Sequence, residues 1–131
     1  MNPGAINDWA ERYRSAWEEA DSEAVAELFM QEGTYRDNIY ELPHRGRRGV
    51  IAYWEGVTSA QSDVSVKMGK PYVDGNRAVV EFWTKMTVAG NPVTLAGALF
   101  LEFNEDGLCR SLHEYWNFIE GTHEPPTGWG G

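Results

Sequence analysis

The chain is poor in cysteine and in long apolar runs. Its single cysteine, Cys109, excludes an intrachain disulfide, and its place within a predicted strand indicates a buried, inert thiol. A scarcity of cysteine fits a reducing compartment. No apolar stretch approaches the length of a membrane span, and the opening residues lack the apolar run of a signal peptide. We therefore expect a soluble protein of the cytoplasm.

Positive charge is also scarce. The chain has 11 Lys and Arg residues against 20 Asp and Glu, and its net charge of -9 repels nucleic acids and anionic membranes. The one basic cluster, HRGRR from His44 to Arg48, is too short to reverse this field and is expected to form a solvated loop. Because it precedes a predicted helix start, where positive charge opposes the helix dipole, an acidic partner is an open alternative.

Residue patterns typical of metal and phosphate sites are missing. His44, His113 and His123 lie far apart in sequence and have no histidine-to-ligand spacing of three or four residues, which argues against a zinc site or a Ser-His pair. Gly46 and Gly49 are not followed by the Lys and Ser or Thr of a phosphate-binding loop. We expect neither a metal nor another cofactor.

Aromatic residues, in contrast, are abundant. In a chain of 131 residues, a size typical of one domain, 13% are aromatic and six are tryptophan, more than a small core needs. Some of these rings are expected to line a pocket. We predict one domain over residues 1–120 and an irregular tail over residues 121–131 (GTHEPPTGWGG), in which Trp129 is the apolar anchor.

The first half of the chain has helical periodicity. An amphipathic helix is predicted from about Ile6 to Ala20, with Tyr13 on its buried face. Asp21 is a good N-cap for a second helix, which Gly33 is expected to close. A short strand should follow at Thr34–Asp37, and then a loop through Pro43 and Gly46. A third helix is expected after this loop, with its apolar side chains at Val50, Ile51, Trp54 and Val57.

Beyond Gln61 the pattern changes to an alternation of period two. Three turn signals, VDGN, AGNP and NEDG, divide this region into four antiparallel strands of a meander. Helices followed by a meander predict an α+β fold in which the helices cover one face of the sheet.

The strand from Arg77 to Val88 has two distinct faces. The inward face is predicted to carry Val80, Phe82, Thr84 and Met86, and the outward face Glu81, Trp83, Lys85 and Thr87. Trp83 on the outer face needs a cover. We therefore predict a homodimer through Trp83, Lys85 and Thr87, since two-fold pairing is the commonest closed assembly.

Two segments resemble the nuclear transport factor 2-like superfamily, in particular its SnoaL-like and ketosteroid isomerase-like members. They are AERYRSAWEEADSEAVAELFMQEGTYRDNIYELPHRGRRGVIAYW and FLEFNEDGLCRSLHEYWNF, so the resemblance extends over nearly all of the chain except the tail. It implies a cone formed by a curved, mostly antiparallel sheet, with three helices on the concave side, as in a cystatin-like roll. It also implies a pocket for a small hydrophobic molecule.

The resemblance carries over to particular residues. The ketosteroid isomerase pattern places its general base on Asp37 and its oxyanion-binding tyrosine on Tyr13. Its second donor, a protonated aspartate, falls on Leu99, and loss of such a donor typically costs about two to three powers of ten in rate. The implied pocket wall comprises Trp17, Phe29, Trp54, Phe82, Thr84, Met86, Leu99 and Trp116.

Another carboxyl group is predicted to face the cavity. Alternation on the last strand puts Glu114 on the same face as Leu112 and Trp116, which the resemblance turns inward. Two carboxyl groups in one apolar pocket favour a state in which one is an ionised base and the other keeps its proton. Glu114 is therefore the third candidate catalytic residue, with Asp37 and Tyr13.

Each candidate also has a structural interpretation. Asp37 could cap a turn, Tyr13 could be a core aromatic, and Glu114 could form a buried ion pair with Arg36 or Arg14. Two classes of function follow. The first is an isomerase, cyclase or dehydratase that uses Asp37 as its base; the second is a non-catalytic binding or dimerisation domain.

Overall fold

The computed structural model describes residues 1–131 as three helices and seven strands. The helices are α1 (Pro3–Glu18), α2 (Ser22–Glu27) and α3 (Gly46–Ser59). The strands are β1 (Phe29–Arg36), β2 (His44–Arg45), β3 (Gln61–Met68), β4 (Tyr72–Asp74), β5 (Arg77–Val88), β6 (Asn91–Phe103) and β7 (Cys109–Glu120).

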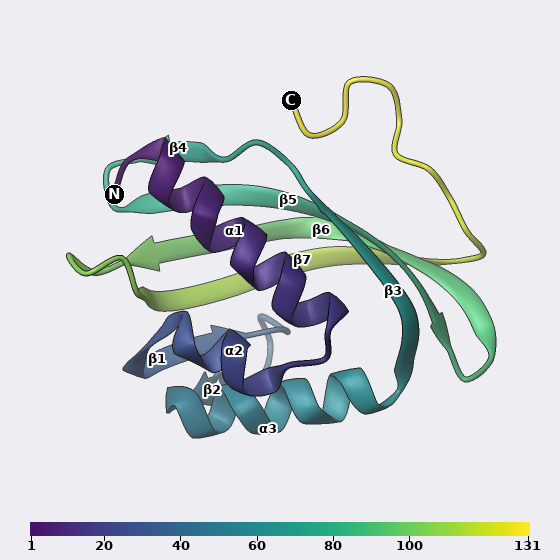
Figure 1. Ribbon diagram of the computed structural model, residues 1–131, viewed down its shortest axis with the longest axis horizontal. Helices are drawn as coiled ribbons and strands as arrows, with labels where there is room; N and C mark the ends of the chain where they lie inside the picture. The colour runs from purple at the N-terminus through teal and green to yellow at the C-terminus, as the bar shows by residue number, and fades with distance from the viewer.

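The strands form one curved sheet in the order β2-β1-β7-β6-β5-β3, with β4 also paired to β5. All neighbours are antiparallel except β1 and β7, which run parallel. The three helices cover one face, and α1 crosses the long strands of the sheet (Figure 1). The predicted α+β cone, a mostly antiparallel curved sheet with helices on its concave side, is confirmed.

Only α2 begins where the sequence predicts, directly after Asp21. The first helix begins at Pro3 rather than at about Ile6, and α3 begins at Gly46, which was expected to lie in the preceding loop. The Asn2 side chain caps α1 by accepting the Ala5 N–H, and the Asp21 side chain caps α2 by accepting the Ala24 N–H. Tyr13 lies on the buried face of α1, as expected. The prediction that Gly33 closes the second helix is wrong, because α2 ends at Glu27 and Gly33 lies within β1. There a Cβ atom would approach the Cys109 carbonyl oxygen at 3.0 Å, so glycine allows β1 to lie close to β7.

The strand predicted at Thr34–Asp37 is longer than expected, since β1 begins at Phe29. The meander is confirmed, with one difference. Five strands rather than four follow Ala60, because β3 and the short β4 both pair with β5. Gly75, Gly90 and Gly107 adopt positive φ angles of 60°, 81° and 80° at the predicted turns.

The two faces of β5 are as predicted. Its inward side chains Val80, Phe82, Thr84 and Met86 are buried in the core. Cys109 is also buried, and burial raises the pKa of its thiol. None of the helices is long and apolar enough to cross a membrane.

The C-terminal residues of the same chain cover Trp83, whereas a second subunit was expected to cover it. Residues 121–131 have no helix or strand and pass over the outer face, where the Trp83 Nε1–H donates to the His123 carbonyl at 2.9 Å. Lys85 pairs with Glu124 of the same segment. Trp83 therefore has a cover within one chain, and the homodimer through this face is still a prediction.

Candidate functional site

The pairing of β1 with β7 brings Asp37 next to Glu114. The last parallel pair in this register is Arg36 with His113, so the next residues along the two strands are Asp37 and Glu114. The Trp116 Nε1–H donates to the Asp37 carbonyl at 3.1 Å and ties the end of β1 to β7. The two predicted carboxyl residues are thus neighbours across β1 and β7, although they are 77 positions apart in the chain (114 − 37).

The Asp37 side chain contacts a histidine that the sequence analysis did not assign to the site. His44 Nε2 lies 2.9 Å from Asp37 Oδ1. The contact forms because β2 folds back on β1 and pairs His44 with Tyr35. The Tyr53 ring packs on the imidazole with centroids 4.6 Å apart. The signal in the sequence was the short strand followed by Pro43, which indicates that the chain turns back.

The turn-capping interpretation of Asp37 is wrong. In the turn after β1, the Asn38 side chain accepts the Tyr40 N–H at 3.0 Å, and the Asn38 carbonyl accepts the Glu41 N–H. The cap is therefore Asn38, whereas the Asp37 carboxylate is held by His44. This leaves Asp37 as a partly exposed carboxylate at the edge of the aromatic core.

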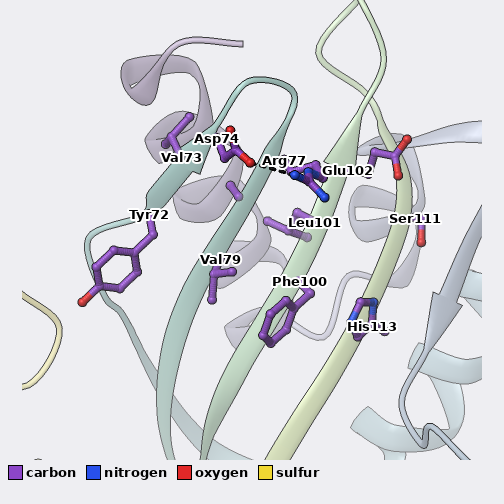
Figure 2. Close-up of a pocket in the computed structure, with 11 residues that line it drawn as sticks. Tyr72, Val73, Asp74, Arg77, Val79, Phe100, Leu101, Glu102, Ser111 and His113 are labelled. Carbon is purple, nitrogen blue, oxygen red and sulfur yellow. Dashed lines mark hydrogen bonds and ion pairs between the residues drawn. The ribbon is translucent and has the colours of Figure 1, made fainter.

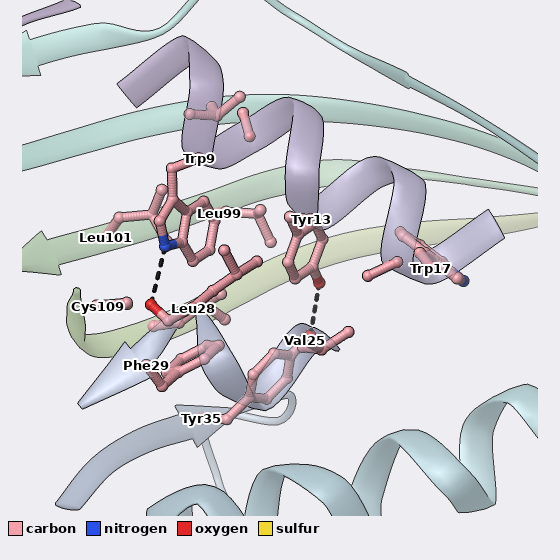
Figure 3. Close-up of a cluster of buried hydrophobic side chains, with 14 of the residues drawn as sticks. Trp9, Tyr13, Trp17, Val25, Leu28, Phe29, Tyr35, Leu99, Leu101 and Cys109 are labelled. Carbon is pink, nitrogen blue, oxygen red and sulfur yellow. Dashed lines mark hydrogen bonds between the residues drawn. The ribbon is translucent and has the colours of Figure 1, made fainter. Parts of the chain in front are cut away.

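A chain of buried hydroxyl groups leads from α1 to Glu114. The Tyr13 and Tyr35 hydroxyls are 2.9 Å apart, and the Tyr35 hydroxyl lies 3.1 Å from Glu114 Oε1. Both tyrosines have no solvent exposure, and Figure 3 shows their side chains meeting between α1 and β1. Tyr35 was not predicted as a site residue. It could have been, because it lies two positions before Asp37 on one strand and so shares its face.

Glu114 is the buried carboxyl group of this cluster, and its pKa is raised. Burial raises its pKa to about 8, the hydrogen bond from Tyr35 opposes this rise, and the charge of Asp37 adds to it. Burial and the charge of Glu114 also raise the pKa values of Tyr13 and Tyr35 well above 10.0. At neutral pH, Glu114 is therefore mostly a neutral carboxylic acid.

The predicted alternative of an ion pair for Glu114 is also wrong. Arg14 pairs with Glu11 and Glu18 on the surface of α1. Arg36 donates to the Glu41 carbonyl. No Lys, Arg or His forms a salt bridge with Glu114.

Cross-strand register relates Glu114 to the position where the family pattern has its second donor. Leu99 on β6 is paired directly with Glu114 on β7. Side chains of such a pair share a face of the sheet, with Cβ atoms about 4.5–5.5 Å apart. Glu114 thus places a carboxyl group beside Leu99, the position at which the family pattern has its protonated aspartate.

Most of the predicted pocket wall lies in the core. Trp17, Phe29, Trp54, Phe82 and Leu99 are at most 3% exposed, and Thr84 and Met86 are also buried. The rings pack closely, with Trp17 centroids 5.3 Å from Trp54 and 5.7 Å from Phe82. Trp116 differs, because 46% of it is exposed. Two inward polar atoms, Trp54 Nε1 and Thr84 Oγ1, have no hydrogen-bond partner.

Two cavities lie outside this cluster. One of about 480 Å³ is on the outer face of the sheet, between Tyr72 on β4 and His113 on β7 (Figure 2). The other, of about 450 Å³, lies at the turn between β5 and β6. Neither is lined by Asp37 or Glu114. No group of three or more His, Cys, Asp or Glu side chains is placed to hold a metal ion.

Comparison with solved structures shows the same fold. A protein with a ketosteroid isomerase-like fold from Catenulispora acidiphila DSM 44928, solved in complex with trimethylamine, superimposes with a TM-score of 0.74 at 20% identity, over 88% of this chain and 86% of that one. SalBIII, an epoxide hydrolase/cyclase-like enzyme in pyran ring formation in the polyether salinomycin, superimposes with a TM-score of 0.74 at 20% identity. The match covers 85% of this chain and 89% of SalBIII. RV0760c from Mycobacterium tuberculosis superimposes with a TM-score of 0.78 at 14% identity, and the match covers 92% of this chain and 99% of RV0760c.

A comparison with curated proteins finds no match. The family described as the SnoaL-like domain matches residues 10–112, from the middle of α1 to the first part of β7. This match over most of the chain shows that the chain belongs to the SnoaL-like domain family.

Proposed function

We propose that the chain is an acid–base enzyme of the isomerase, cyclase or dehydratase type, acting on a small apolar carbonyl compound. The observation that carries this proposal is the neutral, buried Glu114 beside the carboxylate of Asp37. One group is a base and the other a proton donor, which is the pairing that acid–base catalysis at neutral pH needs.

In the proposed reaction, Asp37 takes a proton from the carbon next to the carbonyl group. The C–H electrons move into the carbon–carbon bond, and the carbonyl oxygen becomes negative. A hydrogen bond stabilises this oxygen, and neutral Glu114 supplies it through the Tyr35 and Tyr13 hydroxyls. Asp37 or Glu114 then returns a proton to the substrate. Whether a carbon atom or a leaving group receives this proton determines which product forms.

The hydroxyl chain explains why a protonated Glu114 matters. When Glu114 is ionised, Tyr35 donates to it and Tyr13 donates to Tyr35, so neither hydroxyl has a free proton. A neutral Glu114 can donate to Tyr35 instead, and Tyr35 then donates to Tyr13. In this direction the Tyr13 O–H is free to donate to a substrate oxygen. Protonation of Glu114 thus allows Tyr13 to act as the oxyanion-binding donor that the family resemblance implies.

A probe with its own chromophore tests this proposal without knowledge of the natural substrate. Removal of the C3 proton of 5-nitrobenzisoxazole breaks the N–O bond and gives a coloured cyanophenolate. This probe needs a base and a donor to the oxygen. We expect Asp37→Asn to lower the rate by about two powers of ten or more. Glu105→Gln, at an exposed turn position, should keep the full rate. Equal rates for the wild type and Asp37→Asn contradict the mechanism.

A second function is favoured by the two unpartnered polar atoms in the core. Trp54 Nε1 can only donate, and Thr84 Oγ1 can donate or accept, so an oxygen atom of a bound molecule could partner either of them. In that case the domain binds a small molecule without converting it. Native mass spectrometry of the freshly purified protein distinguishes the two functions, because a retained, unmodified ligand with no turnover of the probe supports binding alone.

A further inference from the structure

The segment 121–131, called the tail below, binds the outer face of the sheet through specific contacts. At its start, the Thr94 hydroxyl donates to the Gly121 carbonyl at 2.8 Å and accepts the His123 N–H at 3.0 Å. Further along, Lys85 Nζ lies 2.7 Å from a Glu124 carboxylate oxygen. The tail therefore lies across β6 and β5 rather than projecting into solvent.

The far end of the tail is held by an aromatic contact. The Trp129 ring meets Trp83 edge to face, with centroids 5.8 Å apart, and Lys67 Nζ lies 5.7 Å from the centre of the Trp129 ring. The Lys70 N–H donates to the Gly130 carbonyl at 2.7 Å. Trp83 and Lys85 were the residues predicted to meet a second subunit, and both are used here by the chain's own tail.

The uncovered part of the same face has the composition of a contact surface. Phe100, His113 and Tyr115 pack on one another, with the Phe100 and His113 rings 5.0 Å apart and nearly parallel. Phe100 is 37% exposed and Tyr115 is 48% exposed. This aromatic group shares the outer surface of β5, β6 and β7 with Trp83, so removal of the tail would expose a further aromatic side chain on that face.

Charge favours a second copy of the chain as the partner for this face. The chain has a net charge of -9, so two copies repel each other over most of their surfaces. On the outer face basic groups accompany the acidic ones, because Arg77 pairs with Asp74 and Arg110 lies 3.6 Å from Glu102. A face of this kind can approach its own copy about a two-fold axis without that repulsion, and acidic and basic groups can then pair across the axis.

We propose that the tail occupies the surface through which two copies of this chain pair, so that tail binding and dimer formation exclude each other. Trp83 cannot contact Trp129 and a second subunit at once. The contacts of the tail with Trp83 and Lys85 are exposed, and Gly121, with φ of 88°, is a position where the chain can change direction at little cost. The tail thus sets the concentration at which the chain dimerises.

The test releases the tail in the full chain without altering the core or the sheet. Glu124→Lys places a positive charge against Lys85, and Trp129→Ala removes the ring that packs on Trp83. Sedimentation velocity over a concentration series should give one chain for the wild type at concentrations where the double variant sediments as two. The apparent dissociation constant of the dimer should fall by about tenfold or more, because the competing state is removed.

Two further variants make the result specific. Adding Trp83→Glu to the double variant should return it to a single chain, since this puts a charge at the centre of the proposed contact. Glu105→Lys, at an exposed turn, makes the same change of two units in net charge as Glu124→Lys and should behave as the wild type. Three results would overturn the proposal. They are a double variant that stays a single chain, a dimer that persists with Trp83→Glu, or a wild-type dimer that the double variant weakens.

Discussion

The raised pKa of Glu114 predicts an unusual dependence of stability on pH. An unfolded glutamate loses its proton near its ordinary pKa of 4.5, whereas folded Glu114 keeps its proton up to about 8. Between these values the folded state holds one more proton than the unfolded state, so the free energy of unfolding decreases as pH rises. The stabilisation from a neutral Glu114 is complete below pH 4.5 and is lost as pH rises to about 8.

The size of the effect follows from the two pKa values. At about 1.4 kcal/mol per pH unit, the interval from 4.5 to about 8 corresponds to at most about 5 kcal/mol. Between pH 5 and pH 8, where titration at each end is incomplete, the expected loss is about 3–4 kcal/mol. That loss is a large fraction of the roughly 5–15 kcal/mol by which whole domains are typically stable.

The assay compares two proteins at two pH values. Urea unfolding followed by circular dichroism gives the free energy of unfolding of the wild type and of Glu114→Gln at pH 5 and pH 8. Glutamine keeps an oxygen that can accept from Tyr35 and has no proton to lose. The difference between the two proteins isolates Glu114 from every other titrating group. The same pH dependence in both proteins would refute a buried, neutral Glu114.

Two other substitutions test the packing around the site. Tyr35→Phe should lower the free energy of unfolding by about 1–3 kcal/mol in urea titration, because it leaves buried partners unsatisfied. It should also move the pH range of the Glu114 effect upward, since the hydrogen bond from Tyr35 opposes the raised pKa. Gly97→Ala should cost at least about 3 kcal/mol, because the added Cβ atom would lie 2.2 Å from the Tyr115 carbonyl oxygen. Gly56→Ala, in α3 with no atom within 4 Å, should instead stabilise the protein by about 0.5–1 kcal/mol, and equal effects of the two glycine variants would contradict the register of β6 and β7.

The sequence predicts most of the fold because local signals determine most of it. Apolar spacing identifies the buried face of α1, Asp21 begins α2, and the glycine-containing turns separate the long strands. The error at Gly33 has a different origin. This glycine is required by the approach of β1 to Cys109, a contact between distant parts of the chain that has no local signature.

The candidate site was predictable only in part. Family resemblance indicated Asp37 and Tyr13. Strand alternation predicted that Glu114 faces inward, and its exposure of 7% agrees with this. The residues that connect them were missed. Tyr35 joins Tyr13 to Glu114, and His44 holds Asp37, because the register of β1 with β7 and with β2 places them there. Such register depends on pairing across the sheet, which alternation within one strand does not determine.

The parallel pairing of β1 with β7 also has a consequence for folding kinetics. Phe29 is paired with Cys109, so the chain must close a loop of most of its length before the two strands meet. Contacts of such high sequence separation form slowly, because the loop entropy is lost before the contact is gained. Since Asp37 and Glu114 lie on opposite sides of this pairing, we expect the site to be assembled among the last events of folding, after the helical hairpin and the β5–β6–β7 meander have formed independently.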